Sequence, residues 1–140
     1  MKTMLKASPI KRKPRSPLKI LQDRLLDLWS EIVKERAGYR CEICKSVKCL
    51  NSHHIVTKKN LTLKWDLKNG CCLCVNCHTL NKLSAHGDPL FFIDWLKKCR
   101  LDDYNYLMAR KNERFDKDYE RIERELKVWI QIIFTEADQT

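Results

Sequence analysis

Two Cys-x-x-Cys pairs restrict most strongly how this chain can fold. The pairs are Cys41/Cys44 and Cys74/Cys77, and they lie close together in the sequence. Structural Zn²⁺ takes four tetrahedral ligands, and thiolates suit it well. Two such tight turns can therefore close a Cys₄ zinc site around the segment between them. A unit of about 40 residues has too little core to fold alone, so we expect it to depend on the metal.

The cysteine register has an overlapping alternative. Cys71 and Cys74 also form a Cys-x-x-Cys pair, but we prefer Cys74/Cys77 because it opens a predicted helix and adjoins His78. The four remaining cysteines are expected to be small, buried, apolar-like residues: Cys49, Cys71, Cys72 and Cys99. A secreted disulfide framework is not expected, because no secretory signal or membrane-length apolar run is visible.

The positive charge of the chain is concentrated at its N-terminal end. Lys and Arg number 28 against 18 Asp and Glu, and residues 1–19 carry seven of the basic residues and no acid. The remainder carries 21 basic against 18 acidic residues. We expect 1–17, which contains three prolines, to be a basic disordered arm that binds a polyanion. An anionic membrane surface or a purely solubilising tail are the alternatives.

The chain is predicted to adopt a mainly helical α+β fold, since only three glycines are present. Ser16-Pro17 predicts a helix over 18–37, whose apolar stripe covers the metal-bound unit or a dimer interface. Further expected elements are strands at 50–56 and 70–73, a loop at 57–69, and a helix of a few turns from near Cys77. A helix is predicted to start at Asp88-Pro89, and Asp102/Asp103 are expected to cap the next one.

The C-terminal residues show a regular apolar pattern from about residue 112. Its members follow helical spacing: Phe115, Tyr119, Ile122, Leu126, Trp129 and Ile133. The pattern is too short to establish a coiled coil, so packing back on the body and homodimerisation both stay open. We therefore divide the chain into the arm, a central domain at 18–100 and a C-terminal helical extension at 101–140.

Histidines and lysines between and just after the cysteine pairs are consistent with phosphodiester hydrolysis. Hydrolysis needs an activated water, a cation on the phosphate and basic groups on the flanking backbone. His53, His54 and His78 could serve the first two needs. The third could be met by Lys58, Lys59, Lys64 and Lys68. Adjacent histidines on a regular strand point to opposite faces, so one of the first two must lie at a strand end or in a distorted turn to face the same metal.

The order of these residues resembles the HNH endonuclease family. The matching motifs are Cys41-x-x-Cys44, His53-His54, Asn69 and Cys74-x-x-Cys77-His78. The wider stretch, about 25–110, is similar to phage-encoded HNH proteins, including the lambda NinG-type recombination proteins. It includes Leu26-Asp27-Leu28-Trp29-Ser30 and Trp65-Asp66-Leu67-Lys68-Asn69. The resemblance implies a small, zinc-stapled ββα-metal core with flanking helices.

The resemblance also implies roles for individual residues. His54 would be the general base, His53 and His78 would bind a catalytic Mg²⁺ or Mn²⁺, and Asn69 would fix the loop that carries His54. The family often has another histidine where this chain has Lys82.

The next histidine after that position is His86. On an unbroken helix it would lie about 12 Å from His78. It can be a ligand only if the chain bends around 81–84. Otherwise it is a loop residue or contacts DNA, and two histidines with waters would suit Mg²⁺.

The function predicted from the sequence is metal-dependent DNA hydrolysis in phage recombination, replication or packaging. The expected location is the cytoplasm of an infected or lysogenic bacterial host. DNA would be held by the loop lysines and by the arm, so affinity should fall steeply with salt. The arm residues are Lys11, Arg12, Lys13 and Arg15. The alternatives are a non-catalytic, zinc-containing nucleic-acid-binding accessory protein and a nuclease that acts on RNA.

Overall fold

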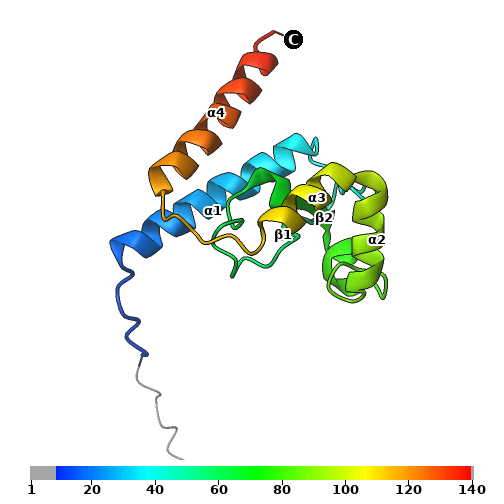
Figure 1. Cartoon of the computed structure of the whole chain (residues 1–140), viewed down its shortest axis with the longest axis horizontal. Coiled ribbons are helices and arrows are strands. Elements are labelled where there is room, and N and C mark those ends of the chain that lie inside the picture. Colours follow the sequence, from blue (N-terminus) through cyan, green and yellow to red (C-terminus); the bar gives the residue numbers. More distant parts are fainter. Residues whose placement is uncertain (1–8, 140) are drawn as a thin grey trace, which may run out of the picture.

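The computed structural model describes residues 9–139 and confirms a mainly helical α+β fold with a two-stranded sheet (Figure 1). In chain order the elements are α1 (Pro17–Arg36), β1 (Leu50–His54), η1 (Leu67–Asn69), β2 (Gly70–Cys74), η2 (Asn76–Leu80), α2 (Pro89–Cys99), α3 (Leu101–Arg110) and α4 (Tyr119–Ala137). Residues 9–16 are exposed and have no regular secondary structure, and residues 1–8 of the predicted arm lie outside the described part. Within 9–139, no helix is long and apolar enough to span a membrane.

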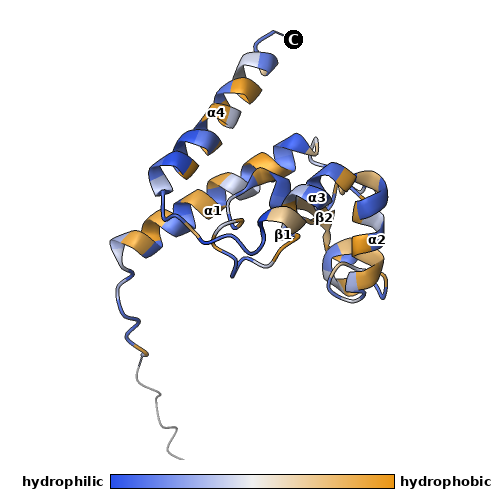
Figure 2. Ribbon diagram, in the orientation of Figure 1, coloured by the Kyte–Doolittle hydropathy of each residue, from blue (hydrophilic) through white to orange (hydrophobic). Residues whose placement is uncertain are grey.

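Helix α1 begins and ends within one residue of the prediction because its terminal signals are local. The Ser16 hydroxyl accepts a hydrogen bond from the Lys19 backbone N–H at 3.2 Å, and Pro17 fits the first turn. Gly38 follows the helix with a φ of +64°, which glycine adopts without strain. The buried side of α1 packs on the sheet through Trp29 and Val33. In Figure 2 apolar and polar stretches alternate along α1.

The sheet is antiparallel and presents two different faces. His54 pairs with Gly70, and His53 pairs with Cys71. Cys72 belongs to the same buried cluster as α1, whereas Cys71 lies in the cluster that contains α2. Because strand side chains alternate, each of the two histidines follows one of these faces. The sheet therefore separates an α1 side, with His54, from an α2 side, with His53.

Strand β1 ends at His54, two residues earlier than predicted. At Val56 the side chain of Asn69 takes the place of a backbone partner on the neighbouring strand. The Ile55 N–H still reaches the Asn69 carbonyl at 3.0 Å, but the Val56 N–H donates to the Asn69 side-chain oxygen. The predicted helix from Cys77 is also shorter, because η2 is a single wide turn closed by an i→i+5 bond from Asn81 to Asn76.

The segments around α2 and α3 follow the sequence signals only in part. Asp88 caps α2 by accepting from the Phe91 N–H at 3.1 Å, as predicted. The capping role predicted for Asp102 and Asp103 is wrong, since Arg100 precedes α3 and both acids lie in its first turn. Asp103 binds the Arg100 guanidinium instead, at 2.8 Å.

The C-terminal apolar pattern folds back on the body along α1. Helix α4 starts at Tyr119, later than the pattern itself, and Ile122 and Leu126 are buried against the α1 cluster. Gln22 of α1 donates to the Tyr119 hydroxyl at 2.8 Å. Toward its C-terminal end α4 rises away from the sheet (Figure 1). Trp129, in the middle of this helix, is 39% exposed. Homodimerisation through this helix stays a prediction.

Candidate functional site

The four predicted cysteines lie together and could bind zinc. Cys41 and Cys44 come from the turn after α1, Cys74 ends β2, and Cys77 lies in η2. Their sulfur atoms all lie within 4.8 Å of one another, and the Sγ atoms of Cys44 and Cys74 are 3.5 Å apart. Tetrahedral Zn–S bonds of about 2.3 Å place sulfurs about 3.8 Å apart, so the arrangement fits the ion. Despite burial, backbone N–H groups, first that of Cys44, lower the pKa of Cys41 to about 7, whereas burial raises the pKa of Cys77 in the same cluster.

The other cysteines lie outside this cluster. Cys71 is fully buried, and burial together with the nearby Glu42 carboxylate raises the pKa of its thiol. Cys72 packs against α1. These two match the expected small core residues, whereas Cys49 and Cys99 are exposed and contradict that expectation. The geometry thus favours the Cys74/Cys77 register over the overlapping pair.

Three histidines form a second cluster that could hold a metal ion. His53 of β1, His78 of η2 and His86 of the following loop bring their ring nitrogens within 4.8 Å of one another. The Nε2 atoms of His78 and His86 are 3.1 Å apart. His86 reaches this place because the chain bends after η2: the Ser84 N–H bonds to the Asn81 carbonyl, and the His86 N–H bonds to the His78 carbonyl. The bend that the sequence required for a third ligand is present.

The chemistry of this cluster suits a transition metal. Burial, reinforced by the neighbouring rings, lowers the pKa of His53 to about 3, and burial also lowers that of His78. These rings are therefore neutral near pH 7 and can bind a cation. Within the described residues, the cluster contains no carboxylate. Imidazoles without carboxylates suit Zn²⁺ and similar ions better than Mg²⁺.

His54 lies beside this cluster and does not belong to it. It is the last residue of β1, and its Nε2 lies 2.9 Å from the Lys64 carbonyl oxygen. A carbonyl only accepts, so Nε2 carries the proton and Nδ1 keeps a free lone pair. Burial lowers the pKa of His54, which keeps the ring neutral. His53, His54 and His86 line one pocket of about 370 Å³.

Asn69 holds the loop that follows His54. Its side chain is fully buried and spans the loop: Oδ1 accepts from the Val56 N–H at 2.6 Å, and Nδ2 donates to the carbonyls of Val56 and Leu63, both at 3.0 Å. This is the loop-fixing contact that the resemblance implies. Asn69 is not among the residues that line the histidine pocket, so its contacts are with the loop rather than with the pocket itself.

Replacing Asn69 by alanine should lower the free energy of unfolding by roughly 2–4 kcal/mol, because backbone groups of Val56 and Leu63 lose their buried partner. Chemical denaturation of the zinc-loaded protein measures the change. Asn81→Ala is the matched control, since that side chain is exposed. Equal stability of the two variants would contradict the role given to Asn69.

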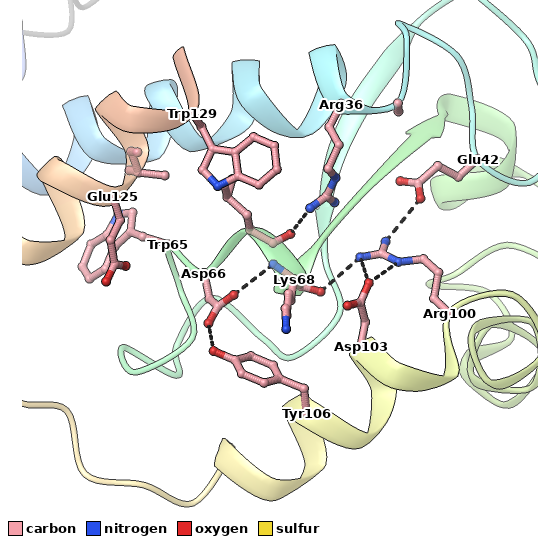
Figure 3. A pocket seen from close by; sticks show the side chains of 13 residues that line it. Arg36, Glu42, Trp65, Asp66, Lys68, Arg100, Asp103, Tyr106, Glu125 and Trp129 are labelled. Atoms are coloured by element: carbon pink, nitrogen blue, oxygen red, sulfur yellow. Dashed lines mark hydrogen bonds and ion pairs between the residues drawn. The ribbon is translucent and has the colours of Figure 1, made fainter. Parts of the chain in front are cut away.

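Two arginines fix the turn that carries Asn69, and neither was predicted as a site residue. Arg36 donates to the carbonyls of Leu67 (2.7 Å) and Gly70 (2.8 Å). Arg100 donates to Gly70 (2.8 Å) and Lys68 (3.2 Å), and it pairs with Glu42 in the turn between the first two cysteines. Figure 3 shows these side chains converging on the turn from both sides.

The predicted DNA-binding residues lie in several local settings. Lys11, Arg12 and Lys13 are exposed before α1, while Arg15 pairs with Asp23 at 3.1 Å. In the loop after β1, only Lys58 lines the histidine pocket, and Lys59 is exposed nearby. The remaining two lie over aromatic rings, Lys64 over Trp65 (5.0 Å) and Lys68 over Tyr106 (4.3 Å).

No family model, curated protein or solved structure matches the chain. Its function is therefore inferred from what the described residues can do chemically. Four thiols suit a structural zinc ion, and three imidazoles suit a second cation. A fourth imidazole with a fixed hydrogen bond lies at the same pocket as two of those three.

Proposed function

We propose that the protein is a metal-dependent endonuclease of the HNH type that hydrolyses DNA phosphodiester bonds. One observation carries the proposal: His54 lines the same pocket as His53 and His86. These two belong to the three-histidine cluster, whereas His54 does not. In this proposal His54 is the free base of the pocket and the histidine cluster is its cation site. Phosphodiester hydrolysis requires both of these groups.

His54 acts as the general base in this proposal. Its proton is held on Nε2 by the Lys64 carbonyl, so Nδ1 is the atom that takes a proton from the attacking water. A buried, neutral imidazole is ready to accept that proton near pH 7. Lys58 lines the same pocket and offers its ammonium group to a phosphate of the substrate backbone.

The three-histidine cluster would hold a divalent ion. When bound, the ion supplies positive charge for the scissile phosphate and the leaving oxygen. His53 and His78 are the ligands expected from the resemblance, and His86 takes the place that Lys82 leaves empty. The succession of β1, β2 and η2, with the cysteine cluster at its side, supports a ββα-metal core. DNA as the substrate, and work in phage recombination, replication or packaging, belong to the proposal.

The proposal is tested by incubating supercoiled plasmid with the protein and Mg²⁺, Mn²⁺, Ni²⁺ or Zn²⁺. We expect ion-dependent nicking, and His86→Ala should need roughly 10–100-fold more ion for the same rate, because a ligand is lost. Lys82→Ala is the control, since Lys82 is exposed and outside the cluster. Cysteine-bound zinc is measured in parallel, so that loss of activity is not mistaken for unfolding.

Wild-type protein that binds DNA but cleaves it with none of these ions would refute the proposal. That result would favour the alternative of a nucleic-acid-binding accessory protein without catalysis. A structured RNA substrate in the same assay separates a DNA nuclease from an RNA nuclease. This arm is needed because positive charge attracts both polymers.

A further inference from the structure

Trp29 lies flat against His54 in the centre of the fold. The two ring centroids are 4.0 Å apart and the ring planes differ by 11°. Trp29 comes from the middle of α1 and is 1% exposed, whereas His54 comes from the end of β1. The sequence pattern marks Trp29 only as part of an apolar helix stripe. The structure adds that one face of the His54 imidazole is covered by a rigid aromatic surface.

Both rings are hydrogen-bonded to one short segment of the loop after β1. The Trp29 Nε1–H donates to the Asp66 carbonyl oxygen at 2.9 Å, and His54 Nε2 bonds to the Lys64 carbonyl oxygen at 2.9 Å. The two acceptors are two residues apart in the chain. If the Trp29 indole shifted, the His54 ring would therefore move relative to the Lys64 carbonyl. That carbonyl fixes the proton on His54 Nε2.

Helix α1 is held in register against the sheet at this point. The Ser52 hydroxyl, two residues before His54, donates to the Ser30 carbonyl at 2.8 Å. Gly70 lies opposite His54, and a Cβ atom there would lie 2.3 Å from a Val33 methyl carbon and 3.0 Å from Trp29 Cζ2. Glycine is thus the residue that lets Trp29 approach the strand pair closely enough to stack.

We propose that Trp29 is a positioning residue for the general base: its indole sets the plane of the His54 ring, so that Nε2 stays on the Lys64 carbonyl and Nδ1 stays available to water. The catalytic consequence rests on the proposed nuclease function. The ring geometry and the proton position do not, and they can be measured separately. If Trp29 only fills the core, its loss should lower stability without changing either of them.

The kinetic test compares two changes at Trp29 with a change elsewhere on the same helix. Trp29→Leu removes the flat face and should lower kcat about 10–100-fold with KM changed less than about twofold, because the base is misplaced while substrate binding is not. Trp29→Phe keeps an aromatic face and should restore kcat to within about fivefold of wild type. Leu25→Ala, a fully buried α1 residue away from the pocket, controls for general loss of stability.

The spectroscopic test does not need nuclease activity. In protein with ¹⁵N-labelled histidine, His54 should show the Nε2–H tautomer and ring protons shifted upfield by the indole face. Trp29→Leu should give a mixture of tautomers, and Trp29→Phe should keep the wild-type state. The His54 signals are assigned by their loss in His54→Ala.

The outcomes separate this proposal from the proposed function. If wild type cleaves nothing, the tautomer measurement alone decides about Trp29. An unchanged tautomer in Trp29→Leu, with kcat no lower than in Leu25→Ala, overturns the positioning role. If Trp29→Leu does not fold, wild type and Trp29→Phe decide about the positioning role. Wild-type His54 ring protons without an upfield shift overturn that role. Upfield-shifted ring protons and a single tautomer, both preserved in Trp29→Phe, support it.

Discussion

Replacing His54 by alanine is expected to abolish plasmid nicking while the protein stays folded and keeps its zinc. General-base catalysis by a positioned side chain contributes about 10²–10⁴-fold to a rate, so the loss should be of that order. No described neighbour could replace this base, because the other three histidines lie in the metal cluster. The measurement is the single-turnover nicking rate at saturating metal, with zinc content and circular dichroism of the same samples.

The control for His54 comes from the same strand. Asn51→Ala changes a polar side chain on β1 that does not line the histidine pocket, and it should nick DNA at the wild-type rate. Equal activity of His54→Ala and Asn51→Ala would remove His54 from the mechanism. A folded His54→Ala protein that still binds DNA would show that the loss is chemical rather than structural.

Replacing Cys74 by serine should release zinc and unfold the central unit. Structural zinc sites contribute about 10–16 kcal/mol in small domains, which is as large as a whole domain stability of about 5–15 kcal/mol. Cys74 ends β2 and is buried beside Cys41 and Cys77, so its replacement removes a zinc ligand from the buried part of the site. Native mass spectrometry gives the zinc stoichiometry, and amide hydrogen exchange gives the extent of unfolding.

Two other cysteines provide matched controls for the zinc site. Cys99→Ser changes an exposed thiol at the end of α2 and should leave zinc content and stability unchanged. Cys71→Ser should lower stability, because the residue is fully buried, yet it should retain zinc. Zinc lost from Cys71→Ser but kept by Cys77→Ser would instead assign the overlapping cysteine pair to the metal.

Features encoded by neighbouring residues were predictable from the sequence. Ser16 and Pro17 set the start of α1, and Asp88 sets the start of α2, because a cap needs only the next three residues. The cysteine pairs were equally readable, since each pair places two sulfurs on one turn. The four thiols therefore gather as predicted.

Features that depend on contacts between distant segments were not predictable in this way. The position of His86 depends on a backbone bend after η2. The sequence spacing between His78 and His86 permits this bend but does not predict it. Trp29 follows the same apolar stripe as its neighbours, so nothing in the pattern marks it as the partner of His54. Arg36 was readable only as a favourable charge in the last turn of a helix, whereas its bonds to Leu67 and Gly70 join residues 31 and 34 positions apart.

The carbonyl of Gly70 accepts from Arg36, which lies 34 residues earlier, and from Arg100, which lies 30 residues later. During synthesis the four cysteines leave the ribosome well before Arg100 does, so zinc can bind to a chain whose turn at 67–70 still lacks one of its two arginines. The turn at 67–70 therefore gains its second arginine only after the chain has passed residue 100, whereas all four cysteines are present before that point.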